Sequence, residues 1–379
     1  MKIVFVSNYY NHHQEAFSYE MERVTNGNYI FVETEPMSLE RKKLGWSVKE
    51  LPSFVRQSYK TDMDYADCLR MIDEADVVIA GSVPNKILKK RLKDKKITFR
   101  YSERPYKCWK NIITMPLRLI KYHTYNYGSK NVYLLCASAF AASDYAKTFN
   151  YLGKAFKWGY FPKTIYYSDI DSLICQKASH SILWAGRFID WKHPEIPVLV
   201  AKKIKEQGIK FHLTMIGDGI MLDSIKRMAV KECVDKNITF LGSVSPDIVR
   251  NYMEQSEVFL FTSDKNEGWG AVLNESMNSA CAVVANENIG SVPYLLHNNN
   301  NGLIYTDNNA SAVADLVIKL FNDDNWRKTI AKKAYETIAN SWNASIAANR
   351  FVELACSLKQ GRFTPFNDGC LCSLESTKQ

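Results

Sequence analysis

The sequence predicts an α/β fold of two domains, each a Rossmann-like, doubly wound parallel sheet. Short apolar, aromatic or β-branched runs alternate with helical patterns along the chain, as repeated βα units require. At 379 residues the chain is too long for one ordinary hydrophobic core and suits two domains of about 165–190 residues. Its 46% hydrophobic and 23% charged residues are typical of a globular protein.

The N-terminal half contains five apolar runs that indicate strands. The first is too short for a secretion signal, and no stretch approaches the roughly 20 apolar residues of a membrane span. Nine scattered cysteines favour reduced thiols, so we expect a cytoplasmic protein. The five expected strands are Ile3–Val6, Tyr29–Val32, Val77–Ala80, Ile97–Tyr101 and Val132–Cys136.

Polar, irregular residues from about 163 to 177 indicate a linker between the domains. We therefore expect an N-terminal domain over residues 1–165 and a C-terminal domain over residues 176–343. Residues 344–379 are expected to form a final helix and a tail.

In the C-terminal half, the expected strands end in glycine turns or lead into helical patterns. Ser181–Ala185 runs into Gly186-Arg187, and Phe211–Ile216 runs into Gly217-Asp218-Gly219. Helical patterns follow both turns, which is the order of a parallel sheet. The remaining strands are expected at Ile238–Gly242, Val258–Thr262 and Ala282–Ala285.

Two acids, Glu267 and Glu275, stand eight positions apart around a Gly-Trp-Gly turn. A strand before the turn and a helix after it place unpaired helix N–H groups near residues 268–271, where they suit a phosphate or sugar oxygen. A carboxylate accepts hydrogen bonds from vicinal hydroxyls, so one acid can bind a sugar ring and the other a ribose. Alternatively, one acid caps the helix and the other lies on a solvated face.

Taken in order, these motifs resemble the nucleotide-sugar-binding domain of GT-B glycosyltransferases, specifically the retaining family 4, or glycosyl transferases group 1. The resemblance covers about residues 180–350 and implies two domains facing a central cleft, with the final helix crossing back over both. The motifs that carry it are Gly186-Arg187, Lys192, Gly217-Asp218-Gly219, Phe240-Leu241-Gly242, the Glu267–Glu275 pair and Trp342.

Residue by residue, the resemblance implies a site for a nucleotide diphosphate sugar. Arg187 and Lys192 would bind the diphosphate, where guanidinium and ammonium groups suit phosphate oxygens. Glu275 would bind the ribose, Glu267 the transferred sugar, and the loop after Gly242 would approach the base. Glu267, Arg187 and Lys192 are the expected catalytic residues. The expected donor-binding residues are Gly186, Arg187, Lys192, Gly217, Gly242, Glu267, Gly268, Trp269, Gly270, Ala271 and Glu275.

The acceptor side differs from the family pattern. The loop after the first strand carries His12 and His13 but none of the glycines that many members have, and no histidine follows Tyr101. His12, His13 and Glu103 are the candidates to orient an acceptor hydroxyl, because each follows an expected strand. The alternative for Glu103 is an ion pair with Arg104 or Lys107. A tyrosine, Tyr294, also replaces the acid that the family usually has after the proline.

Positive charge is concentrated in residues 86–130, which carry fourteen Lys or Arg against two acids, a net charge of +12. The whole chain has a net charge of only +9, so the excess is local. Within this basic segment, Trp109, Ile112, Ile113 and Ile120 recur at helical spacing. Such a segment can lie on an anionic membrane surface, at roughly 1 kcal/mol per basic residue. The alternative is a helix packed on the core with solvated lysines outside.

Other chemistries fit less of the sequence. A dinucleotide-dependent oxidoreductase needs a third glycine, but position 222 is Leu. The pairs Asp62/Asp64 and Asp169/Asp171 match a metal-binding Asp-x-Asp pattern, yet neither follows a clear buried strand. A nucleic-acid-binding protein could use the basic segment, but that leaves the C-terminal motifs unexplained. We expect no metal, no other cofactor and no nucleic acid.

The sequence therefore favours a retaining glycosyltransferase that moves a sugar from a nucleotide diphosphate donor to a hydroxyl of a glycan or lipid-linked glycan. Within the same fold the alternative is a nucleotide-sugar epimerase. Outside it, the alternative is a basic protein that binds nucleic acid or a membrane surface. We expect a cytoplasmic enzyme that can associate peripherally with the cytoplasmic face of the membrane.

Overall fold

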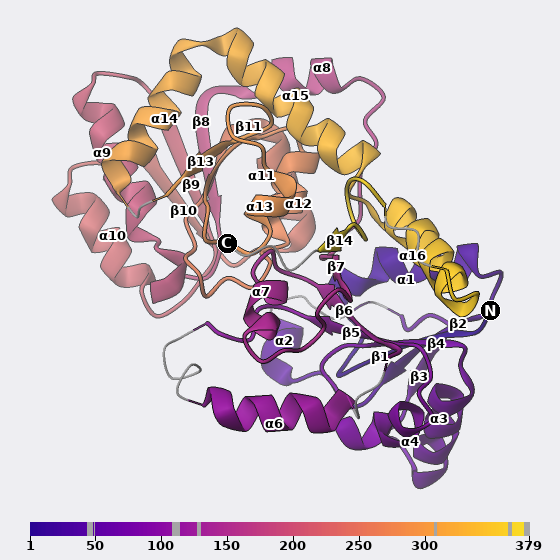
Figure 1. Ribbon diagram of the computed structural model, residues 1–379. Helices are drawn as coiled ribbons and strands as arrows, with labels where there is room; N and C mark the ends of the chain where they lie inside the picture. The colour runs from indigo at the N-terminus through magenta and orange to yellow at the C-terminus, as the bar shows by residue number, and fades with distance from the viewer. Residues whose placement is uncertain are drawn as a thin grey trace. The chain divides into compact units, whose positions relative to one another are not determined.

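A computed structural model describes residues 1–43, 48, 50–107, 114–126, 130–306, 309–362 and 366–374 (Figure 1). The chain folds into two compact units. Unit 1 comprises Met1–Lys163 and Trp342–Gln379, and unit 2 comprises Thr164–Ser341. Each unit is built around its own β-sheet.

Unit 1 contains an eight-stranded sheet in the order β14-β7-β6-β5-β4-β1-β2-β3. All neighbouring strands are parallel except β14, which pairs antiparallel with β7. The strands are β1 (Ile3–Ser7), β2 (Tyr29–Glu33), β3 (Val55–Gln57), β4 (Val77–Ala80), β5 (Thr98–Ser102), β6 (Val132–Cys136), β7 (Ala155–Lys157) and β14 (Ser373–Leu374). The helices are α1 (His12–Val24), α2 (Leu39–Lys43), α3 (Asp62–Glu74), the 3-10 helix η1 (Asn85–Leu88), α4 (Lys89–Lys93), α6 (Met115–Asn126), α7 (Ala141–Ala146) and α16 (Ala344–Lys359).

Unit 2 contains a six-stranded, fully parallel sheet in the order β10-β9-β8-β11-β12-β13. The strands are β8 (Ala178–Ala185), β9 (His212–Ile216), β10 (Ile238–Gly242), β11 (Ser256–Phe261), β12 (Ala282–Asn286) and β13 (Leu303–Tyr305). The helices are α8 (Ile170–Cys175), η2 (Asp190–Lys192), α9 (Glu195–Glu206), α10 (Leu222–Lys231), η3 (Asp235–Asn237), α11 (Pro246–Gln255), α12 (Val272–Asn278), α13 (Val292–Leu295), α14 (Ala310–Asn322) and α15 (Asp324–Asn340).

The central strands of unit 2 are buried along their whole length because helices cover both faces of the sheet. Every residue of β11 and β12 is buried, as expected for parallel strands between two helical layers. On α14, Val313, Val317 and Leu320 form a buried stripe at helical spacing, and this helix packs against α9. Asn309 caps α14 by accepting a hydrogen bond from the Ser311 N–H. Alternation of strand and helix thus produces the expected doubly wound layer.

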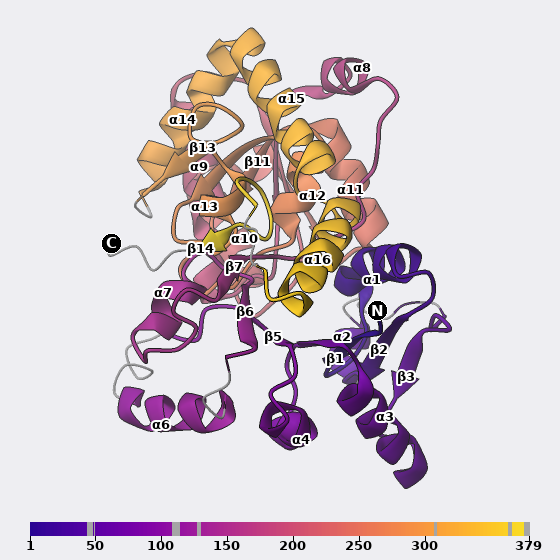
Figure 2. The ribbon, with the colours of Figure 1, turned by 45° about the vertical axis from the view of Figure 1, so that its right-hand side comes forward.

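The last described helix, α16, belongs to unit 1. It packs against α1, as both ribbon views show (Figure 2). Phe351 of α16 is fully buried against Phe99 of β5, with ring centroids 5.0 Å apart. Just before the helix, the buried Trp342 stacks on Phe161. The hydrophobic core of unit 1 therefore includes residues from both ends of the chain.

One basic residue of the segment 86–130 is a core residue. Arg91 is fully buried, and its guanidinium donates hydrogen bonds to the carbonyls of Ile72 and Ala75 at 2.9 and 2.7 Å. Its Nε also donates to the Thr98 hydroxyl at 3.1 Å. Counting Arg91 in a cationic surface was therefore wrong, because its charge satisfies main-chain carbonyls at the end of α3 and beside β5.

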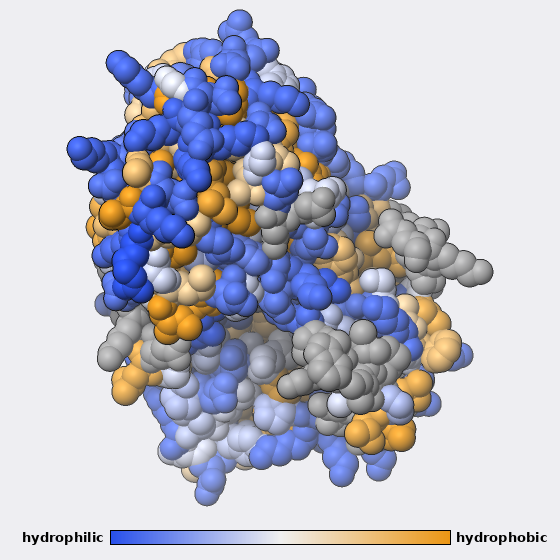
Figure 3. All heavy atoms as spheres, turned by 90° about the vertical axis from the view of Figure 1, so that its left-hand side faces the viewer, coloured by the Kyte–Doolittle hydropathy of each residue, from blue (hydrophilic) through white to orange (hydrophobic). Residues whose placement is uncertain are grey.

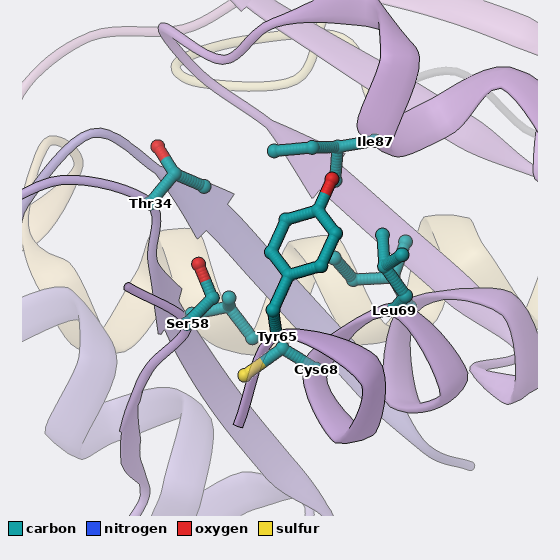
Figure 4. Close-up of a pocket in the computed structure, with 8 residues that line it drawn as sticks. Thr34, Ser58, Tyr65, Cys68, Leu69 and Ile87 are labelled. Atoms are coloured by element: carbon teal, nitrogen blue, oxygen red, sulfur yellow. The ribbon is translucent and has the colours of Figure 1, made fainter. Parts of the chain in front are cut away.

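One face of the molecule is mainly polar. Figure 3 shows one face of the molecule, on which hydrophilic residues predominate and hydrophobic ones gather in small groups. Among the described helices, none combines the length and the hydropathy that crossing a bilayer requires. A small hollow lies in unit 1 (Figure 4), and its lining is mostly apolar. It is lined by Val32, Thr34, Ser58, Tyr65, Cys68, Leu69, Ile72 and Ile87. None of these was a candidate from the sequence.

Candidate functional site

The strand order of unit 2 places a ligand-binding edge between β8 and β11. In chain order its sheet reads 3-2-1-4-5-6, with the reversal between these two neighbours. Connections leave adjacent strands in opposite directions at such a point, which opens a crevice at their carboxyl ends. The loop after β8 contains Arg187 and Lys192, and the loop after β11 contains Glu267. The three expected catalytic residues thus lie on the two loops that border this point.

An ion pair joins the two loops. The Lys192 ammonium contacts the Glu267 carboxylate, and both side chains are largely buried, with exposed fractions of 14% and 11%. The Ser263 hydroxyl also donates to Glu267 at 2.9 Å. These contacts fix the carboxylate while leaving it acceptor capacity for a ligand hydroxyl.

Main-chain hydrogen bonds hold Lys192 in place. The Thr262 hydroxyl donates to the Lys192 carbonyl at 2.7 Å and accepts from the Trp184 indole N–H at 2.8 Å. The Asp264 N–H donates to the Trp191 carbonyl at 3.0 Å. Sequence reasoning missed the roles of Thr262 and Trp184, which look like ordinary strand residues until the loops are placed side by side.

Arg187 is exposed, and its guanidinium carbon lies 5.4 Å from the centre of the Trp191 ring. The Lys192 ammonium lies 4.7 Å from the same ring. Both distances are within cation–π range, so Trp191 draws two positive charges together. No described acidic residue forms an ion pair with Arg187, which keeps its charge available to an anion.

The expected glycines shape the backbone beneath these side chains. Gly217 has a φ of +131°, and a Cβ added there would lie 1.9 Å from the Gly186 carbonyl oxygen. The Gly217 N–H donates to the Gly242 carbonyl at 2.9 Å. A Cβ at Gly219 would lie 2.5 Å from the Phe188 oxygen. These glycines therefore let the loops after β8 and β9 touch, and so they set the position of the Arg187 loop.

The Gly-Trp-Gly turn presents backbone rather than a side chain. Trp269 is fully buried, and its indole N–H donates to Asn274 at 2.9 Å. Its side chain therefore belongs to the core, and only its main chain can reach a ligand. Gly268 is also buried, and a Cβ at Gly270 would lie 2.3 Å from the Phe261 ring. Ala271 precedes the first residue of α12.

Glu275 lies on α12 and is half-buried. Burial raises the pKa of its carboxyl above the ordinary 4.5, although the positive charge of Arg250 opposes the rise. Arg250 donates to the Glu275 carbonyl at 3.0 Å rather than to its carboxylate. Within the described part of the chain, nothing donates a hydrogen bond to that carboxylate, so it retains full acceptor capacity.

The acceptor-side candidates meet in unit 1. His12 and His13 have ring centroids 3.8 Å apart, and His13 lies 5.8 Å from the ring of Tyr160. The Tyr160 hydroxyl donates to Glu103 at 3.2 Å, and Lys107 pairs with the same carboxylate at 3.0 Å. The ion-pair alternative for Glu103 is therefore present, with Lys107. Tyr160 links His13 to Glu103, and no motif in the sequence pointed to this residue.

The ring of His13 is neutral at physiological pH. Burial lowers the pKa of His13 to about 3, with smaller contributions from His12 and Arg41. A neutral imidazole can both accept and donate a hydrogen bond, which suits a residue that orients a hydroxyl.

The two Asp-x-Asp pairs have local structural roles. Asp64 accepts a hydrogen bond from Thr61, the residue that caps α3. Asp169 caps α8, and Asp171 pairs with Lys332 at 2.7 Å. Across the described residues, no group of three or more His, Cys, Asp or Glu side chains is arranged to hold a metal ion.

Residues 173–337 match the family described as Glycosyl transferases group 1. Unit 2 is a group 1 glycosyltransferase domain. An uncharacterised glycosyltransferase of Methanocaldococcus jannaschii is 28% identical to this chain over 171 residues, which make up 45% of this chain and 46% of that protein. The chain spans less than half the length of the curated relatives that it matches.

The likeness of this chain to solved structures extends beyond unit 2. Anabaena HepE in complex with UDP superposes with a TM-score of 0.68 at 14% identity, covering 94% of this chain and 100% of that chain. The pneumococcal O-GlcNAc transferase GtfA, in complex with UDP and GlcNAc, gives a TM-score of 0.69 at 10% identity, covering 95% and 99%. At these identities the likeness concerns the fold, and it confirms the predicted GT-B fold with two Rossmann-like domains.

Replacing Gly217 with alanine should destabilise the glycosyltransferase domain severely, because the new Cβ meets the Gly186 backbone. Gly208→Ala is the matched control, since Gly208 also has a positive φ (+72°) but has open space around a Cβ. We expect the control to lose about 1–2 kcal/mol from its left-handed backbone and Gly217→Ala to lose clearly more. Thermal unfolding measures both, and equal midpoints would show that the loop contact is not needed.

Proposed function

We propose that this protein is a retaining glycosyltransferase that moves a sugar from a nucleotide diphosphate donor to a hydroxyl of a glycan or lipid-linked glycan. The observation that carries the proposal is the meeting of Arg187, Lys192 and Glu267 at the point between β8 and β11. The presence of UDP in two proteins of similar fold makes uridine diphosphate sugars the first donors to test.

In this proposal, Arg187 and Lys192 bind the donor diphosphate. Arg187 is exposed and can engage two phosphate oxygens, whereas Lys192 supplies a compact charge. The ammonium of Lys192 has three donor hydrogens, so it can keep its contact with Glu267 while binding a phosphate oxygen. Glu267, already fixed by Lys192 and Ser263, accepts hydrogen bonds from hydroxyls of the transferred sugar.

The proposed chemistry needs no separate base. The acceptor oxygen forms a bond to the anomeric carbon as the bond from that carbon to the diphosphate oxygen breaks. The acceptor proton passes to the departing phosphate oxygen, so the sugar is delivered on the face that the diphosphate leaves. The protein then contributes positioning and stabilisation of the leaving group's negative charge. Two cationic side chains can provide that stabilisation, so we propose that no metal is required.

Unit 1 would supply the acceptor contacts. We propose that neutral His13 and the Tyr160–Glu103 pair orient the acceptor hydroxyl, since all three lie together at the carboxyl side of parallel strands. His12, whose ring is tilted by 45° against that of His13 with the centroids 3.8 Å apart, would set the orientation of that ring.

A panel of UDP-, GDP-, ADP- and dTDP-sugars tests the reaction class, each with and without EDTA. A transferase slowly hydrolyses its donor and releases the nucleoside diphosphate even without an acceptor. An epimerase would change the sugar while leaving it attached. Activity that disappears with EDTA and returns with manganese would contradict the metal-free proposal.

Arg187→Ala should lower turnover at least about tenfold with an unchanged unfolding midpoint, because one exposed charge–phosphate contact contributes on the order of 1.5–3 kcal/mol. Lys192→Ala should lower turnover as much and also reduce thermal stability, since it leaves the buried Glu267 carboxylate without its cation. Exposed Arg70 of unit 1 gives the control Arg70→Ala. Wild-type kinetics in both variants would remove the two cations from the site.

Glu275→Gln should weaken binding of free UDP, whereas Glu267→Gln should spare it and impair transfer. The proposed partner of Glu275 is the ribose, and that of Glu267 is the sugar that free UDP lacks. Because burial raises the pKa of Glu275, wild-type UDP affinity should fall as the pH drops through that raised pKa and the carboxylate gains a proton. Titration calorimetry decides: equal losses in both variants would contradict this division of roles.

The basic segment supports a proposed membrane contact. On α6, Leu117 and Ile120 lie one turn apart and are 71% and 64% exposed. The helix contacts α4, whose Lys89, Lys90 and Lys93 are also exposed. An apolar pair beside lysines suits an anionic membrane surface. Trp109, Ile112 and Ile113, part of the same prediction, lie outside the described residues.

If this surface binds membrane, the protein should sediment with vesicles containing anionic lipid and detach as salt rises, because the Debye length falls from about 10 Å at 0.1 M to about 3 Å at 1 M. Replacing Lys89, Lys90 and Lys93 with Gln should reduce sedimentation and leave donor hydrolysis unchanged. Replacing Lys210, Lys231 and Lys236 of unit 2, which are also exposed, changes net charge equally and is the control. If both triple variants lost the same amount of sedimentation, the binding would depend on net charge rather than on this surface.

A further inference from the structure

His193, the residue after Lys192, has a backbone conformation that side chains avoid. It ends the 3-10 helix η2 with φ 50° and ψ 57°, in the left-handed region. Glycine adopts this conformation without a steric penalty, whereas a residue with a Cβ does not. Contacts of His193 with its surroundings must therefore offset the strain. The imidazole ring makes such contacts.

Two carboxylates hold that ring from opposite sides. Nδ1 lies 2.8 Å from Glu195 Oε1, in the first turn of α9, and Nε2 lies 3.6 Å from Asp264 Oδ2, in the loop after β11. A ring that faces acceptors at both nitrogens is best satisfied when both nitrogens carry protons. The hydrogen bond to Glu195 accordingly raises the pKa of His193 above 6.5, helped by the charge of Asp264 and opposed by burial.

The other charged groups nearby are already engaged or point elsewhere. The ammonium of Lys192 is held by Glu267. Asp190 of η2 is exposed, and its contact with His193 is through its backbone carbonyl, which accepts the His193 N–H at 3.0 Å. Glu195 and Asp264 are the carboxylates whose contacts with the ring raise its pKa.

The ring contacts join the same two loops as the proposed diphosphate site. Thr262 donates to the carbonyls of Lys192 and His193, at 2.7 and 3.3 Å. The Asp264 N–H donates to the Trp191 carbonyl. His193, Thr262 and Asp264 thus surround the backbone of Lys192, and the ring is the one member of this set whose charge changes near neutral pH.

We propose that protonated His193 is a positioning residue that links Glu195 to Asp264, holds Lys192 in place for the donor diphosphate, and makes donor binding depend on its proton. The inference rests on the proposed donor site. Below the pKa of His193 the ring is charged and the link is complete. As the pH rises through that pKa, the proton is lost, the attraction to one carboxylate goes with it, and binding weakens.

The test compares UDP binding by the wild type and His193→Asn between pH 6 and 9, by calorimetry. Asparagine tolerates the left-handed backbone but cannot carry the charge. At low pH the variant should bind UDP about three- to tenfold more weakly, and the ratio should approach one at high pH, where the wild type has lost its proton. Ionisation of UDP itself affects both proteins equally and cancels in the ratio.

His180→Asn is the matched control. His180 is also a histidine with a left-handed backbone, φ 54°, but it stacks on Phe321 and its Nδ1 contacts the Lys210 carbonyl. This variant should follow the wild-type pH profile. A ratio for His193→Asn that does not change with pH, while the wild type binds UDP, would overturn the inference and leave the proposed function standing. Failure of the wild type to bind any nucleoside diphosphate would overturn both.

Nuclear magnetic resonance gives an independent readout in the ligand-free protein. Titration of imidazole nitrogens should show His193 losing its proton above pH 6.5, and Glu195→Gln should shift that titration to lower pH. The pH at which UDP affinity falls should shift by the same amount. Two results would contradict the proposal. One is a His193 titration at or below pH 6.5 in the wild type, and the other is a pH dependence of UDP affinity that does not shift in Glu195→Gln.

Discussion

The pairing of Lys192 with Glu267 is the constraint on which the rest of the candidate site depends. Removing two charges from water costs several kcal/mol per ion, and a contact between the two does not always offset this. Here the cost is met by further hydrogen bonds, from Ser263 to the carboxylate and from Thr262 to the lysine backbone. The Thr262 bond and the Lys192–Glu267 contact exist only because β8 and β11 are neighbours, so sheet order determines the electrostatics of the site.

The glycines of the motifs matter to the site because they leave room for neighbouring backbone. Gly217 and Gly219 lie under the loop that carries Arg187, with no room for a Cβ against Gly186 and Phe188. Their contribution is the absence of a side chain, which lets three loops approach at main-chain distance. The loop after β8, which carries Arg187 and Lys192, is thereby held in place by its neighbouring loops.

The elements that were predictable from the sequence are those whose signal is local. The five strands expected in the N-terminal half and the C-terminal strands appear within a few residues of their expected limits, because continuous apolar runs predict buried parallel strands. The strands β3, β7, β13 and β14 were not expected, because they have only two or three residues each and leave no such pattern. Their pairing depends on neighbours that are distant in sequence.

Long-range contacts explain the remaining differences. Arg91 occurs in the run Lys89-Lys90-Arg91-Leu92-Lys93, where nothing distinguishes it from its exposed neighbours. Only the approach of carbonyls from the end of α3 shows that it is buried. Tyr160 likewise acquires a role only once Glu103 and His13 lie beside it. Sequence patterns indicate which residues carry the chemistry more readily than which residues hold them in position.

The chain leaves unit 1 after Lys163 and returns to it at Trp342, so unit 2 is inserted within unit 1. On the ribosome, unit 2 therefore emerges in full while the first sheet still lacks α16 and the Phe351 ring that packs on Phe99. Domains generally fold as units during synthesis. The inserted unit can thus reach its native state first, and the part that begins the chain is the last to be completed.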